Sequence, residues 1–248
     1  MGGAINTLAF PAPNLPRQFY EDELKRRPDL VWLETTHQER IPACHVKGGS
    51  SGKQGPHMGG ADVFSYEYVG YSLSKLQGAF YTNLRQQAAC IRSIDAAWRY
   101  LVDTLQIPPQ QIIIFGRSIG SGPSVDLASR REVDISRHSP LNVAGVILQS
   151  PLESGARAVL GHFTSFVGYH LDIFRNYEKI DKITSPVAIM HGTNDEVVPY
   201  ANGEALYKKL LNPFPPLWID GHGHNDMPQA RCFTYVKEFI RHLNKGRT

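Results

Sequence analysis

The sequence lacks most of the features that mark a specialised class of protein. Its three cysteines, Cys44, Cys90 and Cys232, are too few for a disulfide framework and have no metal-binding spacing. Nowhere do about 18 apolar residues follow one another, so no membrane-spanning helix is predicted. The first residues, Met1–Asn6, have neither the basic flank nor the apolar stretch of a secretory signal. Together these absences predict a cytoplasmic protein in a reducing compartment.

A concentration of charge of one sign is also missing. The chain has 26 Lys and Arg residues against 23 Asp and Glu residues, and its formal net charge is +3. The densest basic run, at 25–27, follows three acidic residues at 21–23. Because a nucleic-acid-binding protein of this size usually gathers its basic residues on one face, the charge pattern predicts no nucleic-acid partner.

What is present is the composition of a globular protein with one sizeable core. The 248 residues are 42% hydrophobic and 20% charged, which is an ordinary balance. Short apolar runs alternate with segments of helical periodicity, which predicts an α/β fold with a mostly parallel central sheet and helices on both faces. The predicted strands are Val31–Thr35, Ile41–Val46, Asp62–Val69, Ile112–Phe115, Val143–Gln149, Val187–His191 and Leu217–Asp220. Pro42 predicts a strand start or a sheet edge for the second of them.

Three helices are predicted, two of them from apolar stripes with steps of three and four residues. They cover Ile91–Leu105, Ser121–Arg131 and Phe233–Leu243. The proline-rich residues 1–22 are expected to form an extended arm, and residues 23–248 a single domain. Between two predicted strands, residues 47–60 are rich in glycine and have no regular periodicity, which predicts a flexible loop or linker.

The clearest chemical motif is Gly116-Arg117-Ser118-Ile119-Gly120, which matches the pattern G-x-S-x-G. An apolar run precedes the motif and a helical pattern follows it. This context predicts a sharp strand-to-helix turn that exposes the serine hydroxyl, with the helix N-terminus facing the charge that develops during acyl transfer. Ser118 is therefore the candidate nucleophile.

A serine nucleophile needs a base, and the base needs an orienting acid. In folds with this serine turn, the chain order is serine, acid, histidine. Asp195 follows one predicted strand, and His222 and His224 follow the last one, so parallel strands would bring all three to the edge of the sheet that carries Ser118. The spacing does not choose between the two histidines, and capping the next helix is the alternative role for Asp195.

Other acidic residues are weaker candidates for the acid, namely Glu196, Asp172 and Asp220. His222 and His224 alone would make a poor zinc site, because zinc takes three or four protein ligands. We therefore predict neither a metal ion nor an organic cofactor.

Six segments follow one another in the order of a known family, namely Phe64–Ser72, Ile94–Trp98, Phe115–Arg130, Ile183–Pro186, His191–Val197 and Gly221–Asp226. They resemble the alpha/beta-hydrolase-domain family of membrane-associated protein depalmitoylases. The resemblance implies the alpha/beta-hydrolase fold and a serine hydrolase that cleaves fatty-acyl thioesters or esters. In that family the histidine directly before Asn-Asp is the base, so the resemblance implies His224 as base, Asp195 as acid and Ser118 as nucleophile.

The sequence departs from this family between the second and fourth strands of the expected sheet. The family carries a further strand and a crossover helix there, which need roughly 30 residues, whereas this chain has only residues 47–60. We therefore expect that strand and helix to be missing, unless another segment such as Ile41–Val46 fills the gap. The missing loop supplies the second oxyanion donor, while the first is the backbone N–H of Ile119. The segment His57–Gly60 resembles an oxyanion motif but lacks the helix that should follow it.

The amino end also departs from family members with palmitoylated N-terminal cysteines, because no cysteine precedes Cys44. Residues Met1–Thr7 nearly match a myristoylation signal, so peripheral contact with a membrane stands beside an ordinary soluble N-terminus as an expectation. The stretch Glu153–Tyr177 lies where such folds insert a lid, and its apolar residues are candidates either for lining an acyl site or for the core.

The sequence thus predicts a serine hydrolase, with an acylated protein or a small acyl ester as substrate. Two other interpretations stay open. One is a non-catalytic or weakly active binding protein with the hydrolase fold, and the other is a general esterase or serine peptidase of that fold.

Overall fold

The structure is a computed structural model that describes residues 26–48, 61–69, 83–130, 142–160 and 172–245. The chain divides into two units, Met1–Gln106 and Ile107–Thr248. The arm predicted at 1–22 and most of the glycine-rich segment predicted at 47–60 lie outside the described residues. The single domain expected at 23–248 stays a prediction.

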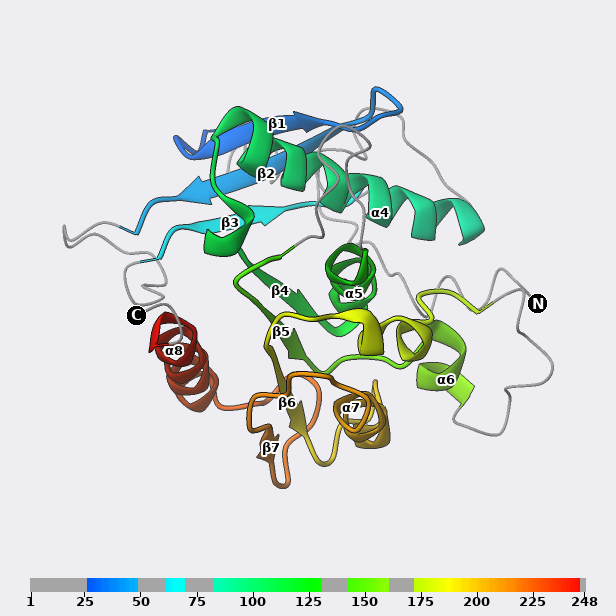
Figure 1. Ribbon diagram of the computed structural model, residues 1–248. Helices are drawn as coiled ribbons and strands as arrows, with labels where there is room; N and C mark the ends of the chain where they lie inside the picture. Colours follow the sequence, from blue (N-terminus) through cyan, green and yellow to red (C-terminus); the bar gives the residue numbers. More distant parts are fainter. Residues whose placement is uncertain (1–25, 49–60, 70–82, 131–141, 161–171, 246–248) are drawn as a thin grey trace. The chain divides into compact units, whose positions relative to one another are not determined.

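An antiparallel sheet and one long helix make up the described part of the first unit (Figure 1). The strands are β1 (Leu30–Glu34), β2 (Arg40–Val46) and β3 (Val63–Tyr66), in the spatial order β1-β2-β3. Helix α4 (Asn83–Arg99) continues into a π-helical turn, Tyr100–Thr104. The three strands and the helix predicted for this part of the chain are therefore present.

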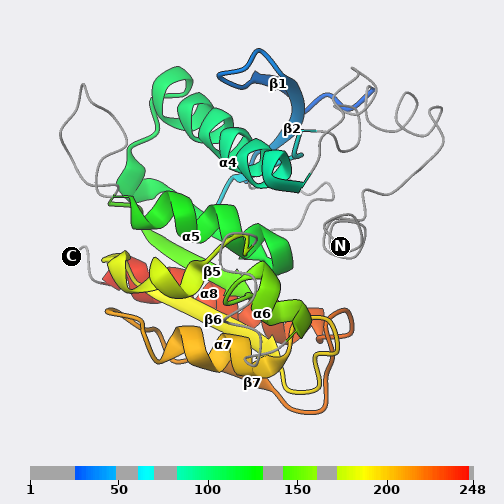
Figure 2. The same ribbon diagram turned by 90° about the vertical axis from the view of Figure 1, so that its right-hand side faces the viewer.

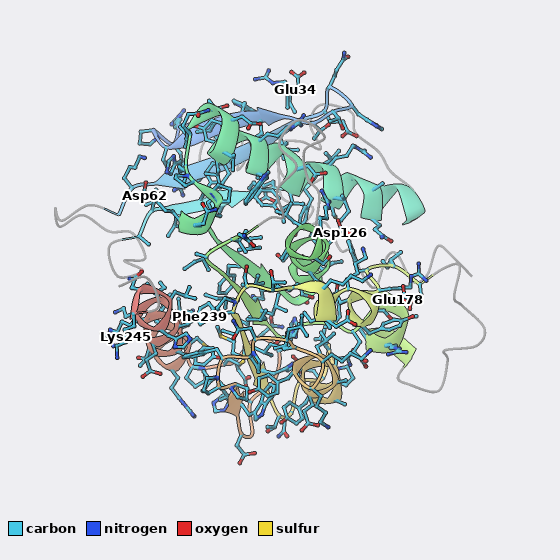
Figure 3. The ribbon with its side chains drawn as sticks, viewed as in Figure 1. Glu34, Asp62, Asp126, Glu178, Phe239 and Lys245 are labelled. Atoms are coloured by element: carbon cyan, nitrogen blue, oxygen red, sulfur yellow. The ribbon has the colours of Figure 1, made fainter. Side chains whose placement is uncertain are left out.

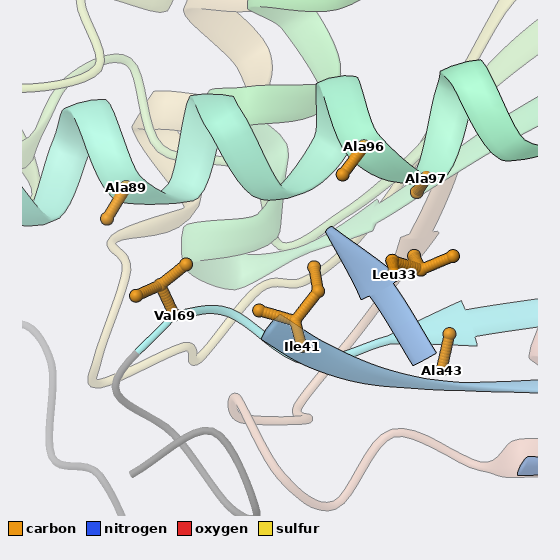
Figure 4. Packing of buried hydrophobic residues seen from close by; sticks show 7 residues of the cluster. All are labelled: Leu33, Ile41, Ala43, Val69, Ala89, Ala96 and Ala97. Atoms are coloured by element: carbon orange, nitrogen blue, oxygen red, sulfur yellow. The ribbon is translucent and has the colours of Figure 1, made fainter. Parts of the chain in front are cut away.

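The core of the first unit lies between the sheet and α4 (Figure 4). Leu33, Ile41 and Ala43 are at most 4% exposed. Ile41 and Ala43 lie two residues apart on β2, so they share one face of the sheet. This face packs against Ala89 and Ala97 of α4, whose small side chains let the helix lie close to the strands.

Pro42 lies neither at a sheet edge nor at a strand start, because it is the third residue of β2, the central strand of its sheet. On one side β2 pairs with β1, where Pro42 lies opposite Trp32. On the other side, the Pro42 carbonyl accepts the Glu67 N–H at 3.0 Å, just beyond the end of β3. The missing N–H of the proline therefore interrupts no pairing within β3. The predicted strand start or edge was wrong, and Ile41–Val46 pairs with β1 and β3 rather than filling the gap expected in the parallel sheet.

A four-stranded parallel sheet forms the centre of the second unit. Its strands are β4 (Ile113–Arg117), β5 (Gly145–Gln149), β6 (Val187–Gly192) and β7 (Leu217–Ile219), in the spatial order β4-β5-β6-β7. Strand β6 is buried along its whole length, as expected for a parallel strand covered on both faces. Each of the four strands was predicted from the sequence.

Helices cover both faces of this sheet (Figures 1 and 2). Helices α5 (Ser121–Ser129) and α7 (Tyr200–Tyr207) lie on one face, and α8 (Gln229–Lys245) lies on the other. Phe239 of α8, labelled in Figure 3, is 0% exposed. A Cβ atom on Gly145 of β5 would lie 2.8 Å from its ring, so the glycine allows the helix to pack directly on the strand. This arrangement confirms the mostly parallel sheet with helices on both faces.

Two helices of the second unit were not predicted from the sequence, α7 and α6 (Gly155–Leu160). The buried side of α7 includes Asn202 and Gly203 beside Leu206, so it shows no apolar stripe. Short helical turns connect the larger elements at Pro109–Gln111, Ser118–Gly120, Asn176–Glu178 and Ile180–Lys182. Within the residues that the structure describes, no helix has the length and apolarity needed to cross a membrane.

Candidate active site

Ser118 lies in the sharp turn between β4 and α5, as the motif predicted. Its φ angle is 52°, in the left-handed region that residues with a side chain rarely adopt. A Cβ atom on Gly116 would lie 2.6 Å from the Ser124 hydroxyl oxygen and 2.7 Å from the Gly120 carbonyl oxygen. Glycine at 116 therefore permits the close approach of α5 to the end of β4.

A network of buried hydrogen bonds links the Ser118 turn to neighbouring segments. The Ser121 hydroxyl donates to the Ser118 carbonyl at 2.7 Å and accepts the Leu152 N–H at 3.2 Å. The side-chain amide of Asn176 donates to the Leu152 carbonyl at 2.8 Å and lies 3.5 Å from the Ser121 hydroxyl. These contacts tie the serine turn to the segment that follows β5.

Asp195 is a fully buried carboxylate in the loop after β6, with a side chain 0% exposed. Its Oδ1 accepts the N–H groups of Val197 and Val198 at 2.9 and 2.8 Å. Its Oδ2 lies 2.7 Å from Nδ1 of His224 and 3.2 Å from Nε2 of His191. Burial raises the pKa of Asp195, but the hydrogen bonds from the two histidines and the backbone outweigh it and hold that pKa well below 3.8.

The alternative role for Asp195, capping the next helix, is not seen. Helix α7 begins at Tyr200, and Pro199 precedes it without a side-chain cap. Asp195 instead accepts the N–H groups of the turn immediately after itself. The carboxylate is therefore fixed in orientation by its own loop, with Oδ2 left for the histidines.

The loops after β6 and β7 are joined by backbone contacts, which bring Asp195 to His224. The Asn194 N–H donates to the His222 carbonyl at 2.9 Å. The Thr193 hydroxyl donates to the Asp220 carboxylate at 3.1 Å and accepts the Gly221 N–H at 2.9 Å. The two loops therefore form one hydrogen-bonded corner at the carboxyl edge of the sheet.

The two histidines that spacing alone left as alternatives have different environments. His224 is 6% exposed and contacts the Asp195 carboxylate. His222 is half-buried, and its Nδ1 lies 2.8 Å from the Asp220 carbonyl. Only His224 of this pair is bonded to Asp195 in the described part of the chain.

Arg117, directly before Ser118, connects the serine turn to the histidine loop. Its guanidinium donates to the His224 carbonyl at 3.0 Å and to the Asn225 side-chain oxygen at 2.8 Å. The described residues show no hydrogen bond between the Ser118 hydroxyl and His224, and catalytic hydrogen bonds are often long before substrate binds. Sequence reasoning missed Arg117, although its position inside the serine motif was the available signal.

The weaker candidates for the acid have other partners. Asp172 accepts the Ala156 N–H at 2.9 Å, in the first turn of α6. Asp220 accepts the Thr193 hydroxyl. Glu196 is exposed, and its carboxylate lies 3.3 Å from the backbone nitrogen of His224. None of the three contacts the imidazole of His224 among the residues described.

Several other predictions lie outside what the structure describes. One is the segment His57–Gly60, which resembles an oxyanion motif. The others are the apolar side chains that are candidates for lining an acyl site, Val159, Leu160, Phe163, Phe166, Val167 and Tyr169. The role of the Ile119 N–H as an oxyanion donor stays a prediction. Across the described ranges, no three His, Cys, Asp or Glu residues are grouped so that they could hold a metal ion.

Curated proteins similar in sequence are alpha/beta hydrolase domain-containing proteins. Protein 17C of Mus musculus is 38% identical over 182 residues, which are 73% of this chain and 51% of that protein. Protein 17B of Xenopus laevis is 42% identical over 180 residues, which are 72% of this chain and 56% of that protein. The chain thus spans about half the length of the curated relatives it matches. No protein-family model matches the chain.

Solved structures similar in fold include esterases. An esterase of Pyrococcus furiosus aligns with a TM-score of 0.64 and 15% identity, covering 93% of this chain and 97% of the esterase. An esterase from a Rhodococcus species aligns with a TM-score of 0.59 and 15% identity, covering 87% of this chain and 99% of the esterase. At this identity, the similarity shows the alpha/beta-hydrolase fold alone.

Proposed function

Because the chain belongs to the alpha/beta-hydrolase-domain family, we propose that it is a serine hydrolase that cleaves acyl thioesters or esters. Ser118 is the nucleophile, His224 the general base and Asp195 the acid that orients it. The observation that carries this proposal is the 2.7 Å contact between the buried Asp195 carboxylate and Nδ1 of His224. Because Nδ1 of His224 is bonded to Asp195, Nε2 is the ring nitrogen that can accept the serine proton.

The mechanism follows from these positions. The Ser118 hydroxyl oxygen attacks the acyl carbonyl carbon while Nε2 of His224 takes the hydroxyl proton. The Ile119 N–H stabilises the oxyanion that forms. His224 then gives its proton to the departing thiolate or alkoxide, and water attacks the acyl-serine by the same proton path in reverse. Asp195 stays ionised throughout and stabilises the imidazolium.

The substrate class within this proposal is a fatty-acyl thioester on a protein. The support is the resemblance of the serine, acid and histidine segments to the depalmitoylase family. The same proposal places the protein in the cytoplasm with peripheral contact to membranes, where acylated proteins reside. A small acyl ester would serve as a model substrate because it carries the same reacting carbonyl group.

A fluorophosphonate probe tests the nucleophile. We expect the wild-type chain to be labelled and the Ser118→Ala variant to be unlabelled while its melting temperature is retained. Ser129→Ala is the matched control, because that hydroxyl bonds within α5 to the Asp126 carbonyl and should leave labelling unchanged. Labelling that persists in Ser118→Ala would rule out Ser118 as the nucleophile.

A substrate panel tests the finer assignment. We expect hydrolysis of a palmitoyl-thioester peptide at a higher kcat/KM than of short-chain p-nitrophenyl esters. Faster turnover of the short esters would indicate a general esterase. Acyl-chain binding without probe labelling or turnover would indicate a binding protein with the hydrolase fold.

A further inference from the structure

His191 is a second histidine at the Asp195 carboxylate that sequence analysis did not single out. It lies near the end of β6 and is 0% exposed. Its Nε2 lies 2.9 Å from the Val198 carbonyl oxygen and 3.2 Å from Oδ2 of Asp195. Both neighbours can only accept at physiological pH, so Nε2 carries the proton and donates to them.

The other ring nitrogen, Nδ1, is buried and has no hydrogen-bond partner among the described residues. A Cβ atom on Gly203 of α7 would collide with it, so Nδ1 faces helix backbone at close range. The ring edge also meets Tyr200, with ring centroids 5.9 Å apart at 90°. A proton on Nδ1 would be buried without an acceptor, which favours a neutral ring that donates through Nε2 alone.

Asp195 therefore receives four donors, two backbone N–H groups on Oδ1 and two histidines on Oδ2. We propose that His191 is a positioning residue, which clamps the Asp195 carboxylate and shares the charge of Oδ2 with His224. The proposal deepens, and rests on, the catalytic role proposed above for the Asp195 and His224 pair. A carboxylate oxygen shared by two donors stabilises an imidazolium less than an unshared one, so removal of the His191 contact should strengthen the interaction between Asp195 and a protonated His224.

Other charged groups also face His224, and the test leaves them in place. Arg117 at the end of β4 donates to the His224 carbonyl. The Glu196 carboxylate, in the loop after β6, accepts the backbone N–H of His224 at 3.3 Å. Within the histidine loop, Asp226 accepts the Gly223 N–H at 2.6 Å, and His222 contacts the Asp220 carbonyl. A shift seen on substituting His191 alone therefore reports the contact between His191 and Asp195.

The experiment is an NMR titration of the His224 imidazole in the full chain, which requires no activity. We expect His191→Leu to raise the pKa of His224 by about half a unit or more, because Asp195 then offers its charge to His224 alone. His191→Gln should restore the wild-type value, since its side-chain amide also donates. In an Asp195→Asn background, His191→Leu should produce no shift.

An unchanged pKa of His224 in His191→Leu would overturn the proposal, and so would an equal shift in the Asp195→Asn background. If His191→Leu does not fold, Gly203→Ala serves instead, because its Cβ atom displaces the ring without removing it and should shift the pKa in the same direction. The acidic limb of kcat/KM should move with the NMR value. A wild-type chain that fails to react with fluorophosphonate would contradict the proposed function, while the titration still decides the role of His191.

Discussion

Ser118 shows how a single residue of this site depends on its neighbours. A left-handed backbone at a residue with a side chain costs on the order of 1–3 kcal/mol, and the φ of Ser118 is 52°. The Ser121 hydroxyl donates to the Ser118 carbonyl and so stabilises the turn. In return, the turn presents the Ser118 side chain at the carboxyl end of the parallel strands, where the loops with Asp195 and His224 also lie.

Replacing His224 should have a far larger effect than replacing His222. His224→Ala should lower kcat by about 10³-fold or more, on the scale of the loss of a triad member. His222→Ala removes a half-buried ring whose Nδ1 lies at the Asp220 carbonyl and not at Asp195, so kcat should change little. Steady-state ester hydrolysis measures both. Equal losses would contradict the assignment of the base to His224.

Asp195 should make the stability of the protein depend on pH. Its pKa in the folded chain lies well below 3.8, because hydrogen bonds from His191, His224 and the backbone outweigh burial. Its ionised form therefore stabilises the fold fully above pH 3.8, and this contribution is lost as the pH falls below that value. We expect the difference in unfolding free energy between wild type and Asp195→Asn to shrink on acidification.

Urea unfolding at neutral pH and at a series of pH values below 4.5 measures that difference. Asp181→Asn is the matched control, because Asp181 is an exposed carboxylate. Its difference from wild type should stay small at every pH. A difference for Asp195→Asn that grows on acidification would contradict the depressed pKa.

At the scale of elements, the site depends on how the loops after β6 and β7 are attached to each other. A Cβ atom on Gly192 would collide with the His222 carbonyl, so the end of β6 and the histidine loop approach as closely as backbones can. The Thr193 hydroxyl bridges both loops as donor and acceptor. Arg117 adds the third element, because it joins the end of β4 to the same loop.

Removing the Arg117 guanidinium should therefore affect turnover more than substrate binding. Arg117→Met should lower kcat about tenfold, because a hydrogen bond to a charged group contributes about 1.5–3 kcal/mol and only part of that would be lost from the placement of His224. The value of KM should change little, since Arg117 acts through the histidine loop. Kinetics on a short acyl ester would measure both values.

Arg241→Met provides the control for Arg117→Met, because Arg241 lies on the exposed side of α8. It removes one positive charge from the same unit and should leave kcat unchanged. Arg117→Lys should recover part of the lost turnover. A loss of kcat in Arg241→Met equal to that in Arg117→Met would assign the effect to net charge instead of position.

At the scale of the whole molecule, the described strands form two sheets, whereas the resemblance to the family implied one sheet. Strand β3 ends the antiparallel sheet and β4 ends the parallel sheet, within the residues that the structure describes. The family carries a further strand and helix in the part of the sequence where this chain has the glycine-rich segment 47–60. Each buried backbone group left without a partner costs about 1–3 kcal/mol, against a typical net stability of about 5–15 kcal/mol.

Restoring a strand and helix of the family type between Gly48 and Gly60 should therefore raise both stability and activity. The melting temperature should increase because backbone groups gain partners. Ester hydrolysis should increase by as much as about 10²–10³-fold if the second oxyanion donor returns with the insert. An insert of equal length made of glycine and serine is the control. A wild-type chain with the same melting temperature and the same rate of ester hydrolysis as the chain with the insert would contradict this prediction.

Most elements of the fold were predictable because their signals are local. The run Ile112–Phe115 and the G-x-S-x-G motif predicted β4, its turn and α5 from neighbouring residues alone. Helix α7 was missed because its buried side includes Asn202 and Gly203, whose burial depends on what packs against them. The prediction that Pro42 marks a strand start or a sheet edge was wrong because it depends on where β3 ends. Pro42 is tolerated in a central strand since its partner Glu67 lies beyond β3, and the residues around Pro42 do not indicate this.

The sequence by itself determined the chemical types and the order of the site residues, serine, then aspartate, then histidine, because these follow from a motif and from the ends of apolar strands. Only the tertiary structure decided that His224 rather than His222 contacts Asp195, and that His191 and Arg117 belong to the same network. The physical reason is distance along the chain for His224 and Arg117, and for His191, only four residues before Asp195, it is the path of the loop that turns the Asp195 carboxylate back onto the imidazole. A hydrogen bond between residues 29 or 107 positions apart depends on how strands pair and loops pack, and no local pattern records that.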